Sequence, residues 1–524
     1  MSRATTSLSC LVSLAIAATA SLPAATAVPS RPGPFSRDLP AGVYAKVDIE
    51  TALSGLRGHE RPPVPQLHLM FRALLQKLLA DPAVTGLIVG EHWDHIQTPS
   101  KYPYIPVEGY DWGYLDDAFA VADQDQKPVQ LLITPGLNSP PSVLKAIPSC
   151  DWLFDLDMPP QDNCGTVDFP KVPEPTNADS HTLPLPWGPT YDADWEEFLA
   201  QLDARYQDND EFASIAVAGP VAASTEMILP TSANTHDGQV DGMWGTLIRH
   251  AFPSSPPLSG QALDEVFVTD WDDTITYYEK AFSGVTLVLT PDSGGDLPDF
   301  GHSVAQTSSW AKAKDNDLYG TECAASIATT DPANPLYGEL MSCEAKTEVL
   351  SYFVGATGPN GKATKVGGMT ASSPTTFGAG DIGIPGVKFF IERSPAPSPL
   401  IGAGAEFDFP VSSKKVQQEG CPRQTGTTTT TTSPAPCSGL TAVEAAYNVL
   451  KVFFDFTPYA QYFGGTKGDG HVDFLGVPYL DVLYAEDHPC GLQFLLDEAS
   501  QFLTGRSASC SVPPRYPPPS RYPT

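Results

Sequence analysis

Short apolar runs typical of β-strands recur along the chain, and helical patterns fill the gaps between them. Eight such runs can be recognised from their apolar content and from the turn residues that bound them. They are Val43–Asp48, Leu87–Gly90, Val129–Thr134, Ser214–Ala218, Val285–Thr290, Lys365–Met369, Ala405–Phe409 and Tyr479–Tyr484. This regular return of strand-type runs constrains the fold more than any other feature of the sequence.

Helical periodicity between the runs indicates how the strands pair. The helical segments include Leu67–Leu79, Tyr114–Ala122, Trp195–Tyr206, Leu263–Phe282 and Ala442–Phe454. Strands that alternate with helices pair in parallel through crossover helices, and eight such units favour a closed (β/α)8 barrel, the TIM-barrel fold. A doubly wound open sheet is the alternative. Both belong to the α/β class.

Long loops account for the size of the chain. Its 524 residues exceed the roughly 250 of a typical barrel, so the surplus must lie in connections. Pro- and Asp-rich stretches at 135–190, 219–262, 291–345 and 410–440 each follow a predicted strand. Loops after strands lie on the C-terminal face of a barrel, where barrel enzymes keep their active sites.

The two ends of the chain differ in character from the middle. Residues 1–27 are typical of an export signal, because Arg3 supplies a positive charge, Leu8–Leu22 is apolar and a small-residue cleavage pattern follows. We expect one barrel domain over 28–510. The Pro-rich tail, 511–524, is too poor in apolar residues to pack and is expected to be disordered. The mature protein is predicted to be secreted or periplasmic.

The cysteines agree with an oxidising compartment. Cys10 leaves with the signal, and the other eight form four pairs that are close in sequence. The pairs are Cys150 with Cys164, Cys323 with Cys343, Cys421 with Cys437, and Cys490 with Cys510. We predict four disulfides that staple the long loops, with free buried thiols as the alternative.

The charge of the chain excludes several classes of partner. Lys and Arg number 30 against 61 Asp and Glu, which gives a net charge of -31. Such a chain repels nucleic acid, whose binding needs clustered cations, and it repels anionic membranes. After the signal, no apolar run approaches the about 20 residues that span a bilayer. We expect no membrane span, and the oligomeric state stays open.

Four stretches carry a resemblance to a known family. They are Gly136–Pro141, Pro186–Tyr191, Gly219–Met227 and Tyr479–Tyr484. In their placement around the predicted strands they resemble the clan A (β/α)8-barrel glycoside hydrolases, over most of residues 43–504. The resemblance implies an enzyme that hydrolyses O-glycosyl bonds of a carbohydrate, with retention of configuration, by two carboxylates.

The resemblance also implies which carboxylates react. In that clan the general acid/base is a Glu just past strand four, and the nucleophile is a Glu at the end of strand seven. By position these are Glu226 and Glu406. Strand alternation puts Glu406 and Asp408 on one face, and we expect Asp408 to bind substrate beside the nucleophile. If Phe389–Arg393 is the seventh strand, the nucleophile is instead Glu392.

Other positions complete the predicted site. We expect the rings of Trp93 and Trp187 to stack on sugars. Asp481, on the predicted eighth strand, either contacts substrate or forms a salt bridge in the barrel lumen. Thr225 stands where the family has an Asn before the acid/base Glu226. The alternative function is therefore a barrel that binds carbohydrate without turnover.

A polar cluster at the end of the second run has two interpretations. Glu91, His92, Asp94 and His95 are residue types that bind metals, but polar substrate binding or solvation is the favoured interpretation. No metal or cofactor is expected. The negative charge of the chain would repel sulfated or uronic-acid polymers. The predicted function is hydrolysis of a neutral glycan by a secreted retaining glycosidase.

Overall fold

The fold is described from a computed structural model of the chain. The described residues are 41–57, 62–97, 109–153, 160, 163–169, 181–225, 228–231, 235, 240–259, 261–283, 285–289, 387–393, 400–407, 474–486 and 492–504. The predicted signal, the tail and the Lys365–Met369 run lie outside these residues.

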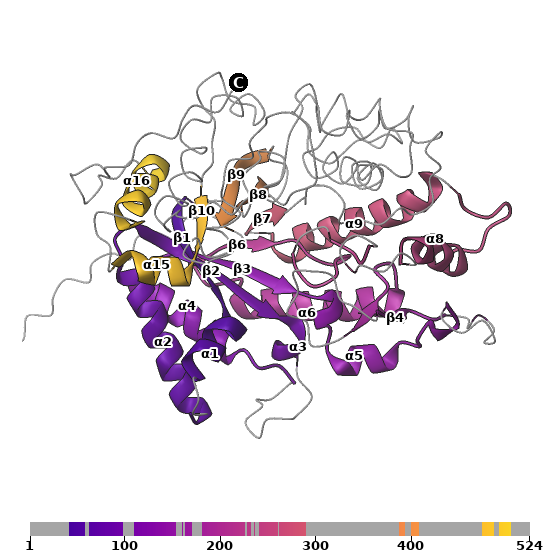
Figure 1. Ribbon diagram of the computed structural model, residues 1–524, viewed down its shortest axis with the longest axis horizontal. Coiled ribbons are helices and arrows are strands. Elements are labelled where there is room, and N and C mark those ends of the chain that lie inside the picture. Colours follow the sequence, from indigo (N-terminus) through magenta and orange to yellow (C-terminus); the bar gives the residue numbers. More distant parts are fainter. Residues whose placement is uncertain are drawn as a thin grey trace, which may run out of the picture. The chain divides into compact units, whose positions relative to one another are not determined.

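Eight strands hydrogen-bond into a ring (Figure 1). In chain order they are β1 (Gly42–Asp48), β2 (Val84–His92), β3 (Val129–Thr134), β6 (Phe212–Ala216), β7 (Thr286–Leu289), β8 (Val387–Arg393), β9 (Leu400–Phe407) and β10 (Phe474–Pro478). Around the ring the order is β1-β10-β9-β8-β7-β6-β3-β2. The chain is therefore an α/β protein with a curled, mainly parallel sheet. The strand β3 matches its predicted bounds, and β1, β2 and β7 overlap theirs closely.

One strand breaks the parallel pattern. β8 runs antiparallel to β7, with Leu287 opposite Arg393, and antiparallel to β9, with Val387 opposite Phe407. The other ladders of the ring are parallel. A regular (β/α)8 barrel, in which all strands are parallel, is therefore not confirmed. An apolar run specifies a strand but not its direction, which is why the sequence could not give this result.

The predicted eighth strand, Tyr479–Tyr484, is wrong. This segment lies in helix α15 (Tyr479–Glu486), and the strand is the preceding β10. Tyr479, Val482 and Ala485 are buried at a spacing of three residues, which is one face of a helix rather than one face of a strand. Pro478 marks the change, because its nitrogen has no hydrogen to donate to a strand ladder.

Helices flank the strands. They are α1 (Ile49–Arg57), α2 (Val64–Ala80), α3 (Trp93–Ile96), α4 (Gly113–Asp125), α5 (Pro141–Ala146), α6 (Pro189–Tyr206), α8 (Val240–Ala251), α9 (Gln261–Ala281), α15 and α16 (Leu492–Thr504). α2 illustrates why they form: Leu67, Phe71, Leu75 and Leu78 recur every three or four residues and are buried. None of the described helices is long and apolar enough to cross a membrane.

A small apolar layer fills the ring. It consists of Tyr44, Ile88, Leu132, Ala216, Val288 and Phe474, one residue from each of six strands. The rings of Tyr44 and Phe474 meet edge to face, with centroids 5.7 Å apart. Below this layer the hydroxyl of Ser214 donates to Oε1 of Gln130 at 3.1 Å. Among the strands whose side chains are described, the lumen is thus a packed core that includes one buried polar pair.

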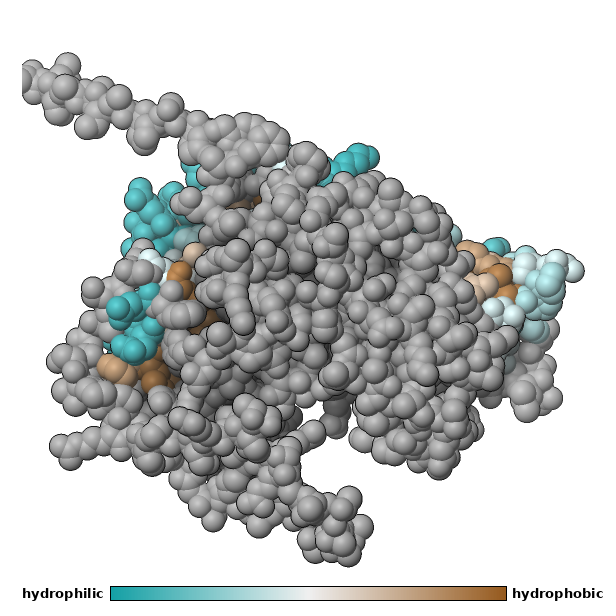
Figure 2. Space-filling view, turned by 90° about the horizontal axis from the view of Figure 1, so that it is seen from above, coloured by the Kyte–Doolittle hydropathy of each residue, from teal (hydrophilic) through white to brown (hydrophobic). Residues whose placement is uncertain are grey.

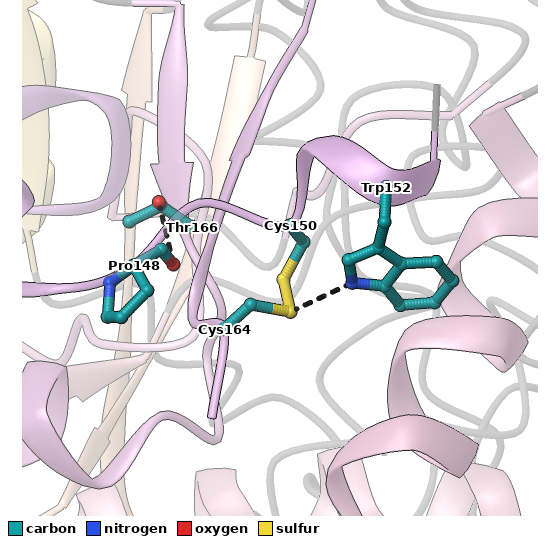
Figure 3. The surroundings of a disulfide bond; sticks show 5 residues. All are labelled: Pro148, Cys150, Trp152, Cys164 and Thr166. Carbon is teal, nitrogen blue, oxygen red and sulfur yellow. Dashed lines mark hydrogen bonds between the residues drawn. A yellow bond between two sulfur atoms is a disulfide. The ribbon is translucent and has the colours of Figure 1, made fainter. Parts of the chain in front are cut away.

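One predicted disulfide is present, between Cys150 and Cys164 (Figure 3). It joins the short 3-10 turn Asp151–Leu153 to strand β4 (Thr166–Asp168), which pairs antiparallel with β5 (Thr182–Pro184). The indole of Trp152 donates to Sγ of Cys164 at 3.3 Å. The other six cysteines of the predicted pairs lie outside the described residues.

The surface of the described part is mixed. In the face seen in Figure 2, hydrophilic and hydrophobic side chains lie next to each other. The exposed large apolar side chains among the described residues are Val64, Leu69, Phe252 and Leu480. They come from three separate parts of the chain, a scatter that is normal for a protein surface.

Candidate functional site

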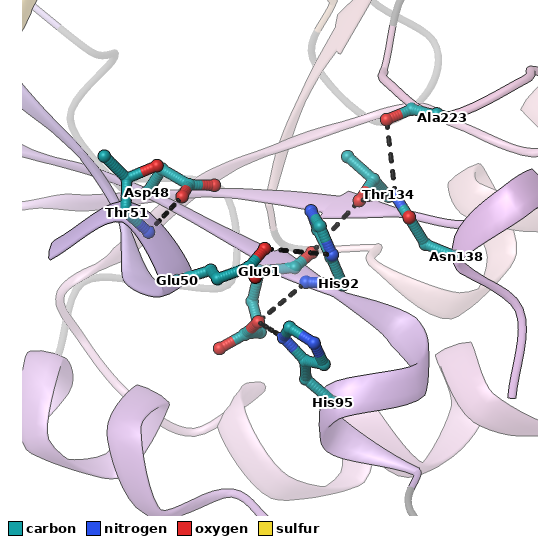
Figure 4. Close-up of polar contacts among 9 residues, drawn as sticks. All are labelled: Asp48, Glu50, Thr51, Glu91, His92, His95, Thr134, Asn138 and Ala223. Carbon is teal, nitrogen blue, oxygen red and sulfur yellow. Dashed lines mark hydrogen bonds and ion pairs between the residues drawn. The ribbon is translucent and has the colours of Figure 1, made fainter. Parts of the chain in front are cut away.

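Polar side chains gather where β1, β2 and β3 end (Figure 4). β1 ends at Asp48, whose carboxylate accepts the backbone N–H of Thr51 at 2.7 Å and so caps the first turn of α1. Glu50 follows in that first turn. Because parallel strands present their carboxyl ends at one edge, Glu50 lies beside the end of β2.

The end of β2 is built around a buried carboxylate. Oε1 of Glu91 accepts the backbone N–H of His92 at 2.8 Å and lies 3.0 Å from Nδ1 of His95. His92 immediately precedes the one-turn helix α3, which carries His95. The turn brings the two imidazole rings together, with centroids 4.9 Å apart. Glu91 therefore holds the ring of His95 and the backbone of His92.

The charges of this pair are coupled. Burial raises the pKa of Glu91, and His95 partly offsets that rise by hydrogen bonding and by its charge. Burial lowers the pKa of His95, but the hydrogen bond and the charge of Glu91 outweigh it and raise the pKa to about 9. Without another ligand, His95 is protonated at neutral pH and forms an ion pair with Glu91.

Glu50, His92 and His95 converge on one point. One nitrogen or oxygen atom from each lies within 4.8 Å of the other two. Nδ1 of His92 is 3.8 Å from Oε2 of Glu50. The side chains of Glu50 and His95 are 40% and 35% exposed, whereas that of His92 is 11% exposed. This triad, Glu50 with His92 and His95, is reachable from solvent.

β3 contributes a rigid amide to the same edge. Nδ2 of Asn138 donates to Oγ1 of Thr134 at 2.9 Å and to the carbonyl of Ala223 at 3.3 Å. Gly136 has a φ of 72°, and a Cβ there would lie 2.1 Å from the carbonyl oxygen of Ala222. Glycine is therefore required at this turn. The contacts tie the end of β3 to the segment after β6.

The two predicted sugar-stacking tryptophans are buried. Trp93 is 0% exposed, and its ring packs against Trp195 and Phe198 at centroid distances of 5.0 and 5.7 Å. Trp187 is 7% exposed and lies 6.0 Å from the ring of Trp244. Stacking on a sugar needs an open ring face. In this structure both rings act as core residues, which corrects the sequence interpretation.

The structure describes three of the five carboxylates predicted for the site. Glu406 lies in β9, in register with Gly476 of β10 and Lys388 of β8. Glu392 lies in β8. Asp481 is fully buried in the first turn of α15, not on a strand, so its predicted position was wrong. Glu226 and Asp408 lie outside the described residues, and their roles stay predictions.

A second region, which sequence reasoning missed, lies between α6 and α9. It is a cavity of about 420 Å³ lined by the carboxyl groups of Asp192, Glu196, Asp270 and Asp273, and by Lys280. Asp192 and Glu196 are four residues apart on α6, and Asp270 and Asp273 are three apart on α9, so each pair shares a helix face. That spacing was the available signal.

The acidic pocket raises the pKa of Asp192 and of Asp270. Burial is the main cause for Asp192, and the charges of Glu196 and Asp273 add to it, which brings the pKa to about 7. Burial also raises the pKa of Asp270 well above its ordinary value, with Asp192 and Asp273 adding to it. Among the described residues, Oδ2 of Asp270 is buried without a hydrogen-bond partner. These carboxyl groups keep protons at a pH where most aspartates have lost them.

Comparisons with known proteins give a limited result. No family model and no curated protein matches this chain. Among solved structures it is similar to a β-galactosidase from Bacillus circulans sp. alkalophilus, with 12% identity and a TM-score of 0.27, over 60% of this chain and 44% of that one. The catalytic domain of a β-amylase from Paenibacillus polymyxa is also similar, with 12% identity and a TM-score of 0.29, over 61% and 85%.

A β-galactosidase from Marinomonas ef1 is similar as well, with 11% identity and a TM-score of 0.26, over 60% of this chain and 44% of that one. The chain thus spans less than half the length of the two galactosidases. Glycoside hydrolases are among its structural neighbours, but at these TM-scores the likeness carries no argument about activity.

Proposed function

We propose that the chain is a retaining glycoside hydrolase that acts on a neutral glycan. Glu226 serves as general acid/base and Glu406 as nucleophile. One carboxyl group protonates the leaving oxygen, while the other attacks the anomeric carbon and forms a covalent glycosyl-enzyme intermediate that water then hydrolyses. In this mechanism the two carboxyl groups are about 5 Å apart.

The order of the barrel strands carries this proposal. In chain order β6 is the fourth strand of the ring and β9 is the seventh. Glu226 follows β6, and Glu406 is the next-to-last residue of β9. These are the strands to which the sequence resemblance assigns the two carboxylates. β6 and β9 run in the same direction and are separated around the ring by β7 and β8, so we expect their carboxyl ends to lie at the same mouth of the ring.

The polar edge of β1 to β3 supports the same interpretation. The partly exposed side chains of Glu50 and His95 offer hydrogen-bonding groups at this edge, and the buried Asn138 fixes the turn after β3 beside them. Sugar hydroxyls need such donors and acceptors. The net charge of -31 repels acidic glycans and has no such effect on neutral ones. We also propose that residues 1–27 direct export and that the remaining cysteines pair as the sequence predicts.

Substitution of the two carboxylates tests the proposal. Glu226→Gln is expected to reduce hydrolysis of natural glycans by about 10²–10⁴-fold, the usual scale of general acid catalysis. An activated aryl glycoside, which needs little protonation, should suffer less in the first step. Glu406→Gln should abolish turnover of both substrates. Glu197→Gln, an exposed substitution on α6, is the control.

A glycan-binding titration distinguishes the alternative function. Thr225, buried before the predicted acid/base Glu226, departs from the family pattern and favours a binding protein without turnover. Tight binding of a glycan panel with no release of product would support that alternative. Turnover with the anomeric configuration retained, followed by proton NMR, would support the enzyme. Full activity in Glu226→Gln would remove Glu226 from the mechanism.

A further inference from the structure

We propose that Glu50, His92 and His95 form a zinc site at the carboxyl ends of β1 and β2, with the fourth coordination position open to solvent. The inference does not depend on the proposed glycosidase activity. It changes the sequence interpretation of this cluster, which favoured polar substrate binding or solvation over a metal and did not include Glu50. In the structure Glu50 lies close enough to act as the third ligand. Glu91 is not a ligand but forms a hydrogen bond with the ligand His95.

The distances are within reach of a tetrahedral site. Zinc binds nitrogen and oxygen at about 2.0–2.1 Å, so donor atoms around a tetrahedral ion lie about 3.3 Å apart. The donor atoms of the triad already lie within 4.8 Å of one another. Glu50 is exposed on the first turn of a helix and can move toward the rings by side-chain rotation. Only a small contraction is needed to close the site.

Glu91 provides the support that metal-bound histidines usually have. A histidine that binds a metal through one ring nitrogen commonly donates its other N–H to a carboxylate, which fixes the ring and raises its basicity. Nδ1 of His95 is 3.0 Å from the buried carboxylate of Glu91, so in this proposal Nε2 is the nitrogen that binds the ion. The ion replaces the proton on Nε2, while Nδ1–H keeps its bond to Glu91.

The chemistry of the donors favours zinc over other common ions. Two imidazole nitrogens and one carboxylate suit zinc, whereas calcium and magnesium prefer oxygen ligands only. Three protein ligands with one open position are typical of zinc sites that bind a water or a substrate, not of closed structural sites. The site also lies at the strand ends where barrel enzymes bind substrates.

Calorimetric titration of the full chain with zinc chloride tests the proposal. The protein is first freed of metal with a chelator, and its folding is checked by circular dichroism. We expect one zinc ion per chain in the wild type. His95→Gln and Glu50→Gln should each weaken binding at least tenfold. His181→Gln, which removes an exposed histidine elsewhere, should leave the affinity unchanged.

Two further measurements separate coordination from a folding defect. Cobalt(II) in place of zinc should give the visible absorption of a tetrahedral site in the wild type, and Glu50→Gln should change that spectrum while the far-ultraviolet spectrum stays native. Glu91→Gln should weaken zinc binding by about 10–100-fold, the usual effect of removing a supporting carboxylate. A folded wild type that binds no zinc, or equal affinity in His95→Gln, would overturn the proposal.

Discussion

The end of β2 and the pocket between α6 and α9 both bury carboxyl groups, but the charges next to those groups have opposite signs. Glu91 lies beside His95, whose pKa is raised to about 9, so the negative charge has a positive partner. Asp192 and Asp270 lie beside further carboxyl groups instead, and their pKa values rise. Burial is the largest influence in both places, but the sign of the neighbouring charge decides what happens next.

This difference separates two kinds of chemistry. The β2 site keeps a fixed ion pair next to exposed ligand atoms, which suits the binding of a cation or a polar ligand. The acidic pocket keeps protons near neutrality, so its charge changes with pH. A raised pKa is therefore insufficient evidence of a catalytic site. Asp192 has a pKa of about 7, a value typical of a catalytic acid, yet it lies on a helix and not at a strand end.

The largest expected loss of folding stability comes from removing Glu91, the carboxylate that pairs with His95 at the end of β2. Glu91→Ala leaves the backbone N–H of His92 without its acceptor and His95 without its anion. Breaking a buried pair costs about 3–5 kcal/mol, and we expect about 3 kcal/mol because the His95 side chain is partly exposed. Urea unfolding followed by circular dichroism measures the loss.

The control for this change is a pair at the surface. Arg205 and Asp116 are joined by an ion pair in which each side chain is about 40% exposed. Exposed pairs contribute about 0–1 kcal/mol, so Arg205→Gln should cost far less than Glu91→Ala. If the two substitutions reduce the free energy of unfolding equally, the β2 site is not the balanced, buried pair described above.

The sequence predicted correctly those parts of the fold that depend on local residue patterns. The strands β1 and β3 were located correctly because Val43, Val47, Val129 and Leu131 are apolar residues buried in continuous short runs. The first disulfide was also correct, since Cys150 and Cys164 are only 14 residues apart. Such features depend on residues that are close in the chain.

The errors occurred where the pattern fits two structures or where distant segments meet. In Tyr479–Tyr484 the apolar residues suit either a strand or a helix, and only the pairing of β10 with β1 decides between them. Glu50 was missed because the closure of β1 against β2 brings it to His92. The acidic pocket was missed because it needs α6 to pack on α9. The roles of Glu226 and Asp408 stay predictions.

The second prediction concerns pH. The pKa of Asp192 is about 7 in the folded protein against an ordinary 3.8, so the folded state holds a proton that the unfolded chain has lost. Stability should therefore fall as the pH rises from about 4 to about 7. The slope for one group is at most about 1.4 kcal/mol per pH unit. Asp270, Asp273, Glu196 and Lys280 share this pocket.

Comparison of variants separates the contribution of Asp192 to the pH dependence of stability from that of the other carboxylates. Asp192→Asn should be more stable than the wild type near neutral pH, by about 2 kcal/mol after allowance for partial solvent exposure, and the difference should vanish near pH 4. Asp123→Asn, at an exposed position on α4, is the control and should show no such trend. A constant difference between wild type and Asp192→Asn at all pH values would contradict the assignment of this proton.

The smallest expected effect comes from adding a second cation on α9, beside Lys280, to the acidic pocket. Asp273→Lys replaces an exposed carboxylate that raises the pKa of both Asp192 and Asp270 with a positive charge. We expect a gain of about 0.5–1 kcal/mol above neutral pH at low ionic strength, the scale of a partly exposed pair. Salt should reduce this gain, because the Debye length falls from about 30 Å at 0.01 M to about 8 Å at 0.15 M.

Asp123→Lys changes the net charge by the same amount at an exposed site of α4, so it measures the general effect of reducing a charge of -31. Thermal unfolding of both variants in low and high salt provides the comparison. A larger gain in Asp273→Lys would mean that a neighbouring cation can stabilise the acidic pocket as His95 stabilises Glu91. Equal gains would mean that only the total charge matters, and the contrast between the two regions would then not extend to stability.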